Sequence, residues 1–126
     1  MKSVLVVYNQ PDIFFLIHEL LNIKGYSVDF AFDWQEGLKK YLNNHFDMII
    51  TGAKIPKYME HELSRQTRSS RRQHTFLIGI SRTSKELNSK YFDAIFQKPF
   101  RLKTMVNNIQ HLLQSEEIKG GFAVEG

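Results

Sequence analysis

The chain contains no cysteine, which removes several kinds of chemistry at once. Without cysteine there is no disulfide, no thiolate ligand for zinc and no cysteine nucleophile. The sequence also has only 3 prolines, and no apolar run approaches the roughly 20 residues that a membrane-spanning helix needs. Residues 1–7 carry one charge and a short apolar stretch, which is too little for a secretion signal. These absences predict a soluble, cytoplasmic protein with no membrane partner.

What is present is ordinary for a globular protein. The 126 residues are 42% hydrophobic and 24% charged, which is enough for one domain with a sizeable core. We expect this domain to span residues 1–115, with residues 116–126 as a flexible tail or the start of a linker. The five histidines are scattered without metal-ligand spacing, so we expect no metal site and no cofactor.

Positive charge is concentrated in one part of the chain. The net charge is +4, yet residues 54–82 alone hold seven Lys or Arg against two Glu, a net of +5. The densest part is a candidate basic patch of Arg65, Arg68, Arg71 and Arg72. Such a patch is either a solvated face or a contact for an anionic partner. Both interpretations stay open from the sequence alone.

Short apolar segments alternate with amphipathic ones along the whole chain. The apolar, β-branched segments predict strands over residues 3–8, 27–32, 47–51, 75–80 and 94–97. Apolar residues at helical spacing predict helices near residues 11–24, 34–42, 60–70, 83–91 and 102–113, of which the third and fourth are weak patterns. Asp33 and Glu36 form a capping-box pattern at the second helix. Five strands that alternate with helices predict an α/β fold with a parallel sheet covered on both faces.

Four motifs, in their order and spacing, resemble those of response-regulator receiver domains. They are Val6-Val7-Tyr8-Asn9-Gln10-Pro11-Asp12, Gly25-Tyr26-Ser27-Val28, Phe46-Asp47-Met48-Ile49-Ile50 and Lys98-Pro99-Phe100. The resemblance covers about residues 2–114. It implies a flavodoxin-like (βα)5 doubly wound fold with strand order 2-1-3-4-5 and a site at the carboxyl ends of the strands.

The positions that this resemblance assigns to the phosphorylation pocket depart from the family. In chain order these positions are Tyr8, Asn9, Gly52, Ser81, Ile95 and Lys98. Receivers hold magnesium with two acidic residues where this chain has Tyr8 and Asn9. They phosphorylate an aspartate four residues before a proline, and counting back from Pro56 gives Gly52. Ser81 and Lys98 keep the family's hydroxyl and lysine, whereas Ile95 replaces an aromatic switch residue.

These replacements remove the chemistry of phosphorylation. Phosphoryl transfer to a carboxylate needs a carboxylate, and Gly52 has no side chain. Magnesium prefers hard oxygen ligands, and three carboxylates are missing from one pocket. We therefore predict a receiver that is not phosphorylated, in which Ser81 and Lys98 are either relics or binding groups.

The charge of Lys98 then needs another explanation. Burying an ammonium without a partner is unfavourable. We expect Lys98 to reach solvent or to pair with a nearby acid such as Asp12. The alternative is a pocket of reversed sign, in which Lys98 and Ser81 take up an anion.

The predicted function is a receiver-like module of two-component phosphorelay signalling that binds protein partners without phosphorylation. In receivers the fourth helix, fifth strand and fifth helix form the partner or dimer face, here about residues 83–115. The alternative is a basic anion- or nucleic-acid-associated module that uses the arginines of residues 65–72, although no helix-turn-helix pattern supports it. No nucleophile–base set is visible, so we expect no enzyme activity.

Overall fold

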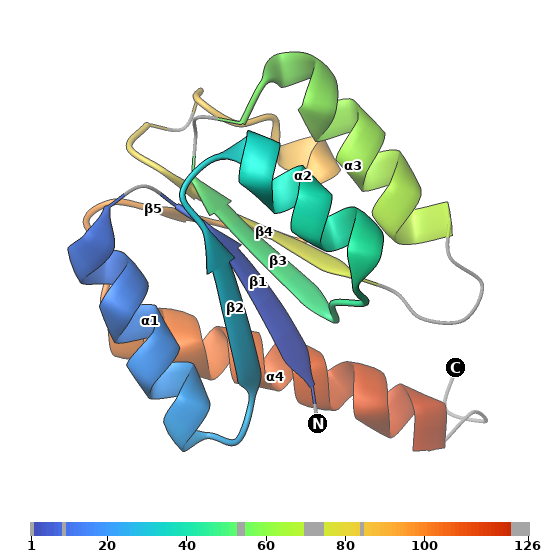
Figure 1. Cartoon of the computed structure of the whole chain (residues 1–126). Helices are drawn as coiled ribbons and strands as arrows, with labels where there is room; N and C mark the ends of the chain where they lie inside the picture. The colour runs from blue at the N-terminus through green and yellow to red at the C-terminus, as the bar shows by residue number, and fades with distance from the viewer. Residues whose placement is uncertain (1, 9, 53–54, 70–74, 84, 122–126) are drawn as a thin grey trace.

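The computed structural model describes residues 2–8, 10–52, 55–69, 75–83 and 85–121, which form one sheet between two layers of helices (Figure 1). The strands are β1 (Ser3–Val7), β2 (Ser27–Ala31), β3 (Met48–Gly52), β4 (Phe76–Ser81) and β5 (Ala94–Gln97). The helices are α1 (Pro11–Ile23), α2 (Trp34–Asn43), α3 (Lys57–Ser69), the 3-10 helix η1 (Ser89–Tyr91) and α4 (Leu102–Gly121). All neighbouring strands are parallel, in the order β2-β1-β3-β4-β5. The predicted flavodoxin-like α/β fold and its strand order are confirmed.

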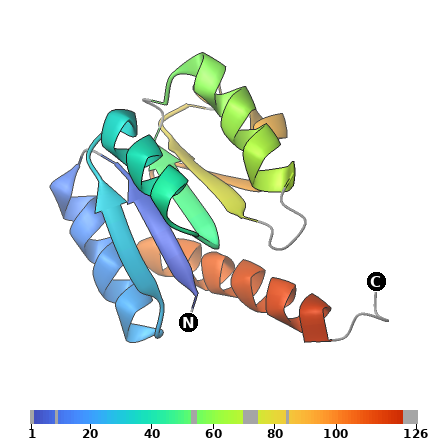
Figure 2. The same cartoon turned by 45° about the vertical axis from the view of Figure 1, so that its right-hand side comes forward.

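The core has two halves, one on each face of the sheet. Helices α1 and α4 cover one face, and α2 and α3 cover the other (Figures 1 and 2). Successive side chains of a strand point to opposite faces. Val4 and Val6 of β1 therefore join the half under α1 and α4, while Leu5 and Val7 join the half under α2 and α3. This burial on both sides explains why the central strands read as unbroken apolar runs.

Local signals at helix starts agree with the structure. Pro11 occupies the first turn of α1, with Asp12 beside it. At α2, the Asp33 side chain accepts a hydrogen bond from the Glu36 N–H at 2.9 Å, and Glu36 Oε1 accepts one from the Phe32 N–H at 3.0 Å. The predicted capping box is therefore present, with its return bond on the residue before the cap. Helix α4 is longer than expected and continues past residue 115 to Gly121. None of the helices in the described ranges is long and apolar enough to cross a membrane.

The helix predicted over residues 83–91 is wrong. In the described part of this segment the chain turns irregularly and then forms only the short η1. Leu87 is buried against β4, where a Cβ on Gly79 would lie 2.5 Å from Leu87 Cδ1. The buried carboxylate of Glu60 on α3 accepts a hydrogen bond from the Asn88 N–H at 3.1 Å and pairs with Lys57 at 3.2 Å. This segment is therefore held in place by the buried side chain of Leu87 and by the Glu60 carboxylate, and not by the apolar face of a helix.

The buried carboxylate of Glu60 predicts a measurable contribution to stability. We expect Glu60→Ala to lower the free energy of unfolding by about 1–3 kcal/mol, because it leaves the Asn88 N–H without its acceptor. Urea denaturation followed by circular dichroism measures the change. Glu62→Ala is the matched control on the same helix: its carboxylate pairs with Arg65 at the surface, so its effect should stay within about 0.5 kcal/mol. Equal effects of the two variants would contradict the proposed anchoring of residues 85–88.

Candidate functional site

The retained and replaced pocket residues meet at the carboxyl edge of the sheet. Tyr8 directly follows β1, Gly52 ends β3, Ser81 ends β4 and Lys98 follows β5. Parallel strands end at the same edge, which brings these four positions together. Asn9, the other predicted position after β1, lies outside the described residues.

The centre of this edge is filled by the ring of Tyr8. The residue is buried with the core under α1 and α4. A Cβ added at Gly52 would lie 2.7 Å from Tyr8 Cδ1 and 2.8 Å from Tyr8 Cε1. Carbon atoms do not approach this closely without strain. The tyrosine ring therefore occupies the space that a side chain at position 52 would need.

Lys98 is held by two neutral groups. Its ammonium donates a hydrogen bond to Gln10 Oε1 at 2.9 Å and lies 5.0 Å from the centre of the Tyr8 ring, a cation–π distance. Gln10 Oε1 also accepts a hydrogen bond from the Tyr8 hydroxyl, with 3.2 Å between the two oxygens. The predicted pairing of Lys98 with an acid such as Asp12 is therefore wrong: its partners are the neutral Gln10 and Tyr8.

The remaining predicted positions take different places. The Ser81 hydroxyl is buried and has no hydrogen-bond partner among the described residues. Its backbone carbonyl accepts from the Lys98 N–H at 2.8 Å, and the Lys98–Pro99 peptide bond is cis. Ile95 packs against the core under α2 and α3. Ser81 is therefore the one retained pocket group whose hydroxyl remains unpaired in the described chain.

Two of the three other polar residues near the strand ends have structural roles. Thr51 points to the face opposite Tyr8, where its hydroxyl accepts a hydrogen bond from Trp34 Nε1 at 2.8 Å. Asp47 lies at the opposite, amino end of β3 and accepts from the Ser3 N–H at 2.8 Å. Asp12 is exposed in the first turn of α1. Thr51 and Asp47 thus bind neighbouring elements, whereas the N-cap of α1 is Gln10 and not Asp12.

The donor set at this edge does not fit magnesium. A phenol, an amide oxygen and a hydroxyl replace the carboxylates that such an ion prefers. The Lys98 ammonium beside Gln10 adds a positive charge at the same place. Across the described ranges, no three carboxylate or imidazole groups gather closely enough to hold a metal ion.

The candidate basic patch is only partly described. Arg71 and Arg72 lie outside the described residues, and of Arg68 only the backbone position in α3 is known. The guanidinium of Arg65 binds the Glu62 carboxylate through two of its nitrogens, and this hydrogen bond and charge raise the pKa of Arg65. The Arg65 side chain is therefore paired with a neighbour on its own helix.

Sequence reasoning missed Gln10, which joins Tyr8 to Lys98. A signal was available: Gln10 stands in the first motif where the family pattern carries glutamate. The sequence-based prediction named the two preceding positions, Tyr8 and Asn9, instead.

Comparison with known proteins gives a consistent result. No protein-family model matches the chain. The response regulator ArlR of Staphylococcus saprophyticus is 28% identical over all of this chain and 59% of its own length. The transcriptional regulatory protein RprY of Bacteroides fragilis is 24% identical over 88% of this chain and 49% of its own length. The chain thus spans about half to three fifths of these curated relatives.

Solved structures agree with the sequence matches. The response regulator TrrA of Thermotoga maritima, in complex with Mg²⁺ and BeF, superposes with a TM-score of 0.72 at 26% identity, covering 89% of this chain and 99% of TrrA. A CheY-like receiver domain of Methanospirillum hungatei superposes with a TM-score of 0.77 at 22% identity, covering 94% and 98%. In fold and in sequence, the chain is similar to receiver domains of response regulators. Its fold is the CheY-like form of the flavodoxin-like family, and its described residues form one α-helix fewer than the (βα)5 pattern.

The contact between Tyr8 and Gly52 predicts strong coupling between two substitutions. Gly52→Ala should destabilise the protein by about 1–3 kcal/mol, because its methyl group overlaps the tyrosine ring. In a Tyr8→Ala background the same substitution should cost nothing, since alanine suits a strand better than glycine. A double-mutant cycle by urea denaturation measures a coupling of at least about 1 kcal/mol. Equal effects in both backgrounds would show that the ring does not occupy this space.

The partners of Lys98 predict that the edge takes up no small anion. The lysine is already bound to Gln10 and Tyr8, and the Tyr8 ring fills the space at Gly52. Titration with phosphate or sulfate should shift the amide resonances of Gly52, Ser81 and Lys98 only weakly and without saturation. Saturable shifts confined to these residues and lost in Lys98→Met would establish the anion pocket instead.

Proposed function

We propose that this receiver domain acts in two-component signalling without being phosphorylated, by binding a protein partner in one fixed conformation. The single observation that carries the proposal is the Tyr8 ring against Gly52. In an ordinary receiver the acceptor carboxylate and its metal need this space. Here the position has neither a carboxylate nor room for one.

The groups around the ring support the same proposal. A receiver lysine beside an acidic cluster responds to added charge, whereas Lys98 is held by the neutral Gln10 and Tyr8. Ile95, at the aromatic switch position, packs into the core. We infer that the pocket has no second arrangement to adopt, so the output surface stays in one state.

The partner is proposed to be an acidic protein surface of the same signalling pathway. One solved relative, TrrA, is recorded in a complex with the histidine kinase ThkA, at a TM-score of 0.70 and 25% identity, covering 90% of this chain and 99% of TrrA. On the proposed partner face, residues 83–115, four exposed cations are Lys85, Lys90, Arg101 and Lys103.

The two acidic side chains of that face accept hydrogen bonds from backbone N–H groups of the same chain. Glu86 Oε1 accepts from the Arg82 and Thr83 N–H groups, at 2.8 and 3.0 Å. Asp93 accepts from the Leu77 N–H at 2.7 Å. These two carboxylates keep their charge, but the four exposed cations outnumber them, and this excess of positive charge favours an acidic partner over a second copy of the same face.

The basic patch adds no second candidate function, because Arg65, its described side chain, is paired with Glu62. We also propose that the chain is not an enzyme. The pocket groups that remain, Ser81 and Lys98, have no carboxylate or imidazole partner within the described chain.

A phosphorylation assay tests the proposed mechanism. After incubation with acetyl phosphate and Mg²⁺, the intact mass of the domain should be unchanged, because no carboxylate stands at Gly52. Gly52→Asp alone should also remain unmodified, since the metal ligands are still missing and the tyrosine ring is still in place. The readout is intact-protein mass spectrometry, with an ordinary receiver domain as positive control.

A restored variant sharpens the test. Tyr8→Asp, Asn9→Asp and Gly52→Asp together return the three carboxylates and remove the ring, so this variant should gain one hydroxylamine-labile phosphate. Modification of the unaltered domain at a stoichiometry near one would overturn the proposed function. The same would follow if a purified histidine-kinase partner bound the domain only in the presence of ATP.

A further inference from the structure

Among the described residues β2 pairs only with β1, so the outer edge of β2 is where the sheet ends. The Ser27 N–H donates to the Lys2 carbonyl, and the Ala31 carbonyl accepts from the Tyr8 N–H, so these residues direct their backbone groups towards β1. Because backbone groups alternate in direction along a parallel strand, those of Val28, Phe30 and Phe32 point outward. An edge of this kind is a template for pairing with another strand.

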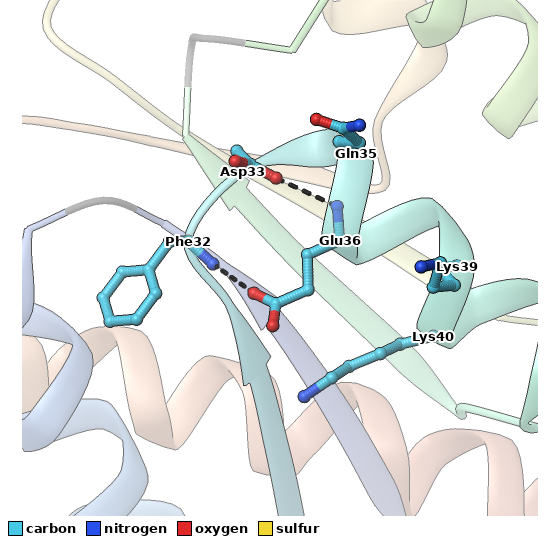
Figure 3. A pocket seen from close by; sticks show the side chains of 6 residues that line it. All are labelled: Phe32, Asp33, Gln35, Glu36, Lys39 and Lys40. Atoms are coloured by element: carbon cyan, nitrogen blue, oxygen red, sulfur yellow. Dashed lines mark hydrogen bonds between the residues drawn. The ribbon is translucent and has the colours of Figure 1, made fainter.

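Three side chains close this edge. Asp29 Oδ1 accepts a hydrogen bond from the Phe30 N–H at 2.8 Å. Lys40 of α2 donates to the Phe30 carbonyl at 2.8 Å and to Asp29 Oδ1 at 2.8 Å. The next outward group, the Phe32 N–H, donates to Glu36 Oε1 at 3.0 Å (Figure 3). The outward donors and acceptors of Phe30, and the donor of Phe32, are therefore all used by the chain itself.

Aromatic side chains flank the closed edge. Phe32 is 58% exposed and Phe30 is 39% exposed. Their rings meet edge to face at 6.5 Å, and His18 of α1 meets Phe30 at 6.3 Å. Beside them, a groove of about 530 Å³ runs between the end of β2 and α2, lined by Phe32, Asp33, Gln35, Glu36, Lys39 and Lys40 (Figure 3). An apolar, β-prone strand thus lies at the surface with only a side-chain latch over its backbone.

We propose that the Asp29–Lys40 ion pair is a latch on a strand-pairing surface, and that the surface takes the β2 edge of a second copy of this chain when the latch opens. This inference rests on the backbone of β2 and is independent of the pocket at the carboxyl edge.

A second copy is the occupant that suits this surface best. An antiparallel pairing of two β2 edges about a two-fold axis uses the same groups from each chain. It sets the aromatic rings of Phe30 and Phe32 against their counterparts, which are favourable cross-strand neighbours. Once the latch opens, the outward N–H and C=O groups of Phe30 in one copy are the donor and acceptor that the same groups of the other copy need. This self-complementarity of the backbone is what singles out a second copy as the partner.

The Asp29–Lys40 ion pair is easily broken because it is exposed to solvent. The side chains of Lys40 and Asp29 are 31% and 49% exposed, and ion pairs of this kind are weak and screened by salt. Their hold on Phe30 depends on both members, since Lys40 covers the carbonyl and Asp29 the N–H.

Removal of the latch tests the proposal. Asp29→Ala/Lys40→Ala should lower the dimer dissociation constant by at least about tenfold against the unaltered chain. Size-exclusion chromatography with light scattering over a concentration series measures it, and circular dichroism verifies folding. Hydrogen exchange should show new protection at Val28 and Phe30 in the associated form. Lys39→Ala is the matched control: Lys39 lines the same groove but takes no part in the latch, and its variant should behave as the unaltered chain does.

Two further variants separate strand pairing from simple aromatic adhesion. Added to the double variant, Phe30→Pro removes the outward N–H while leaving the bonds to β1 intact, so the dimer should be lost. Phe30→Ala keeps that N–H, so its dimer should weaken but persist. A folded double variant that stays monomeric would overturn the proposal. So would equal association of the proline and alanine variants, or association of the Lys39→Ala control.

Discussion

Strand β1 pairs with β2 on one side and β3 on the other, and its residues from Val4 to Val7 are shielded by helices on both faces. The position of every other element follows from this double burial. Parallel neighbours require crossover helices, and the two faces of β1 divide these helices into pairs, α1 with α4 and α2 with α3. Because β1 continues directly into Tyr8, the same constraint carries an aromatic ring to the carboxyl edge of the sheet.

At that edge, the packing of an aromatic ring fills the centre of the site. A receiver pocket of the ordinary kind holds several carboxylates together and depends on a metal ion and a lysine to balance them. Here the positive charge of Lys98 is held by neutral groups: the ring of Tyr8 fits against Gly52, and its hydroxyl and the Lys98 ammonium share one amide oxygen of Gln10. The substitutions compensate one another, because a glycine at 52 leaves the space that a tyrosine at 8 fills. The Ser81 hydroxyl has no hydrogen-bond partner in the described chain.

Charged side chains make comparable structural contacts at two places away from the pocket. Glu60 reaches from α3 to hold the segment that precedes η1, and Lys40 reaches from α2 to cover the edge of β2. In both, a charged side chain on a helix satisfies backbone groups that a longer element or a neighbouring strand would otherwise satisfy. One of these contacts lies between α3 and the segment before η1, and the other lies at the β2 edge of the sheet.

The sequence by itself determined the order of elements, the parallel sheet and the membership of the pocket. Unbroken apolar strands and amphipathic helices follow from burial, and parallel strands bring Tyr8, Gly52, Ser81 and Lys98 to one edge whatever their side chains do. Sequence reasoning failed for residues 83–91, where a weak helical pattern yields to the insertion of Leu87 against Gly79. It also expected Asp12 beside Lys98, where the structure has Gln10.

Only the tertiary structure decided which groups touch. The fit of the Tyr8 ring to Gly52, the choice of Gln10 by Lys98 and the closure of Phe30 by Asp29 and Lys40 each join residues from different elements. Such contacts depend on side-chain rotamers, strand register and the distance between neighbouring elements. Hydrophobic periodicity records which face a residue occupies, but not which neighbour it meets there, and this is why the pocket was predictable in position and not in its contacts.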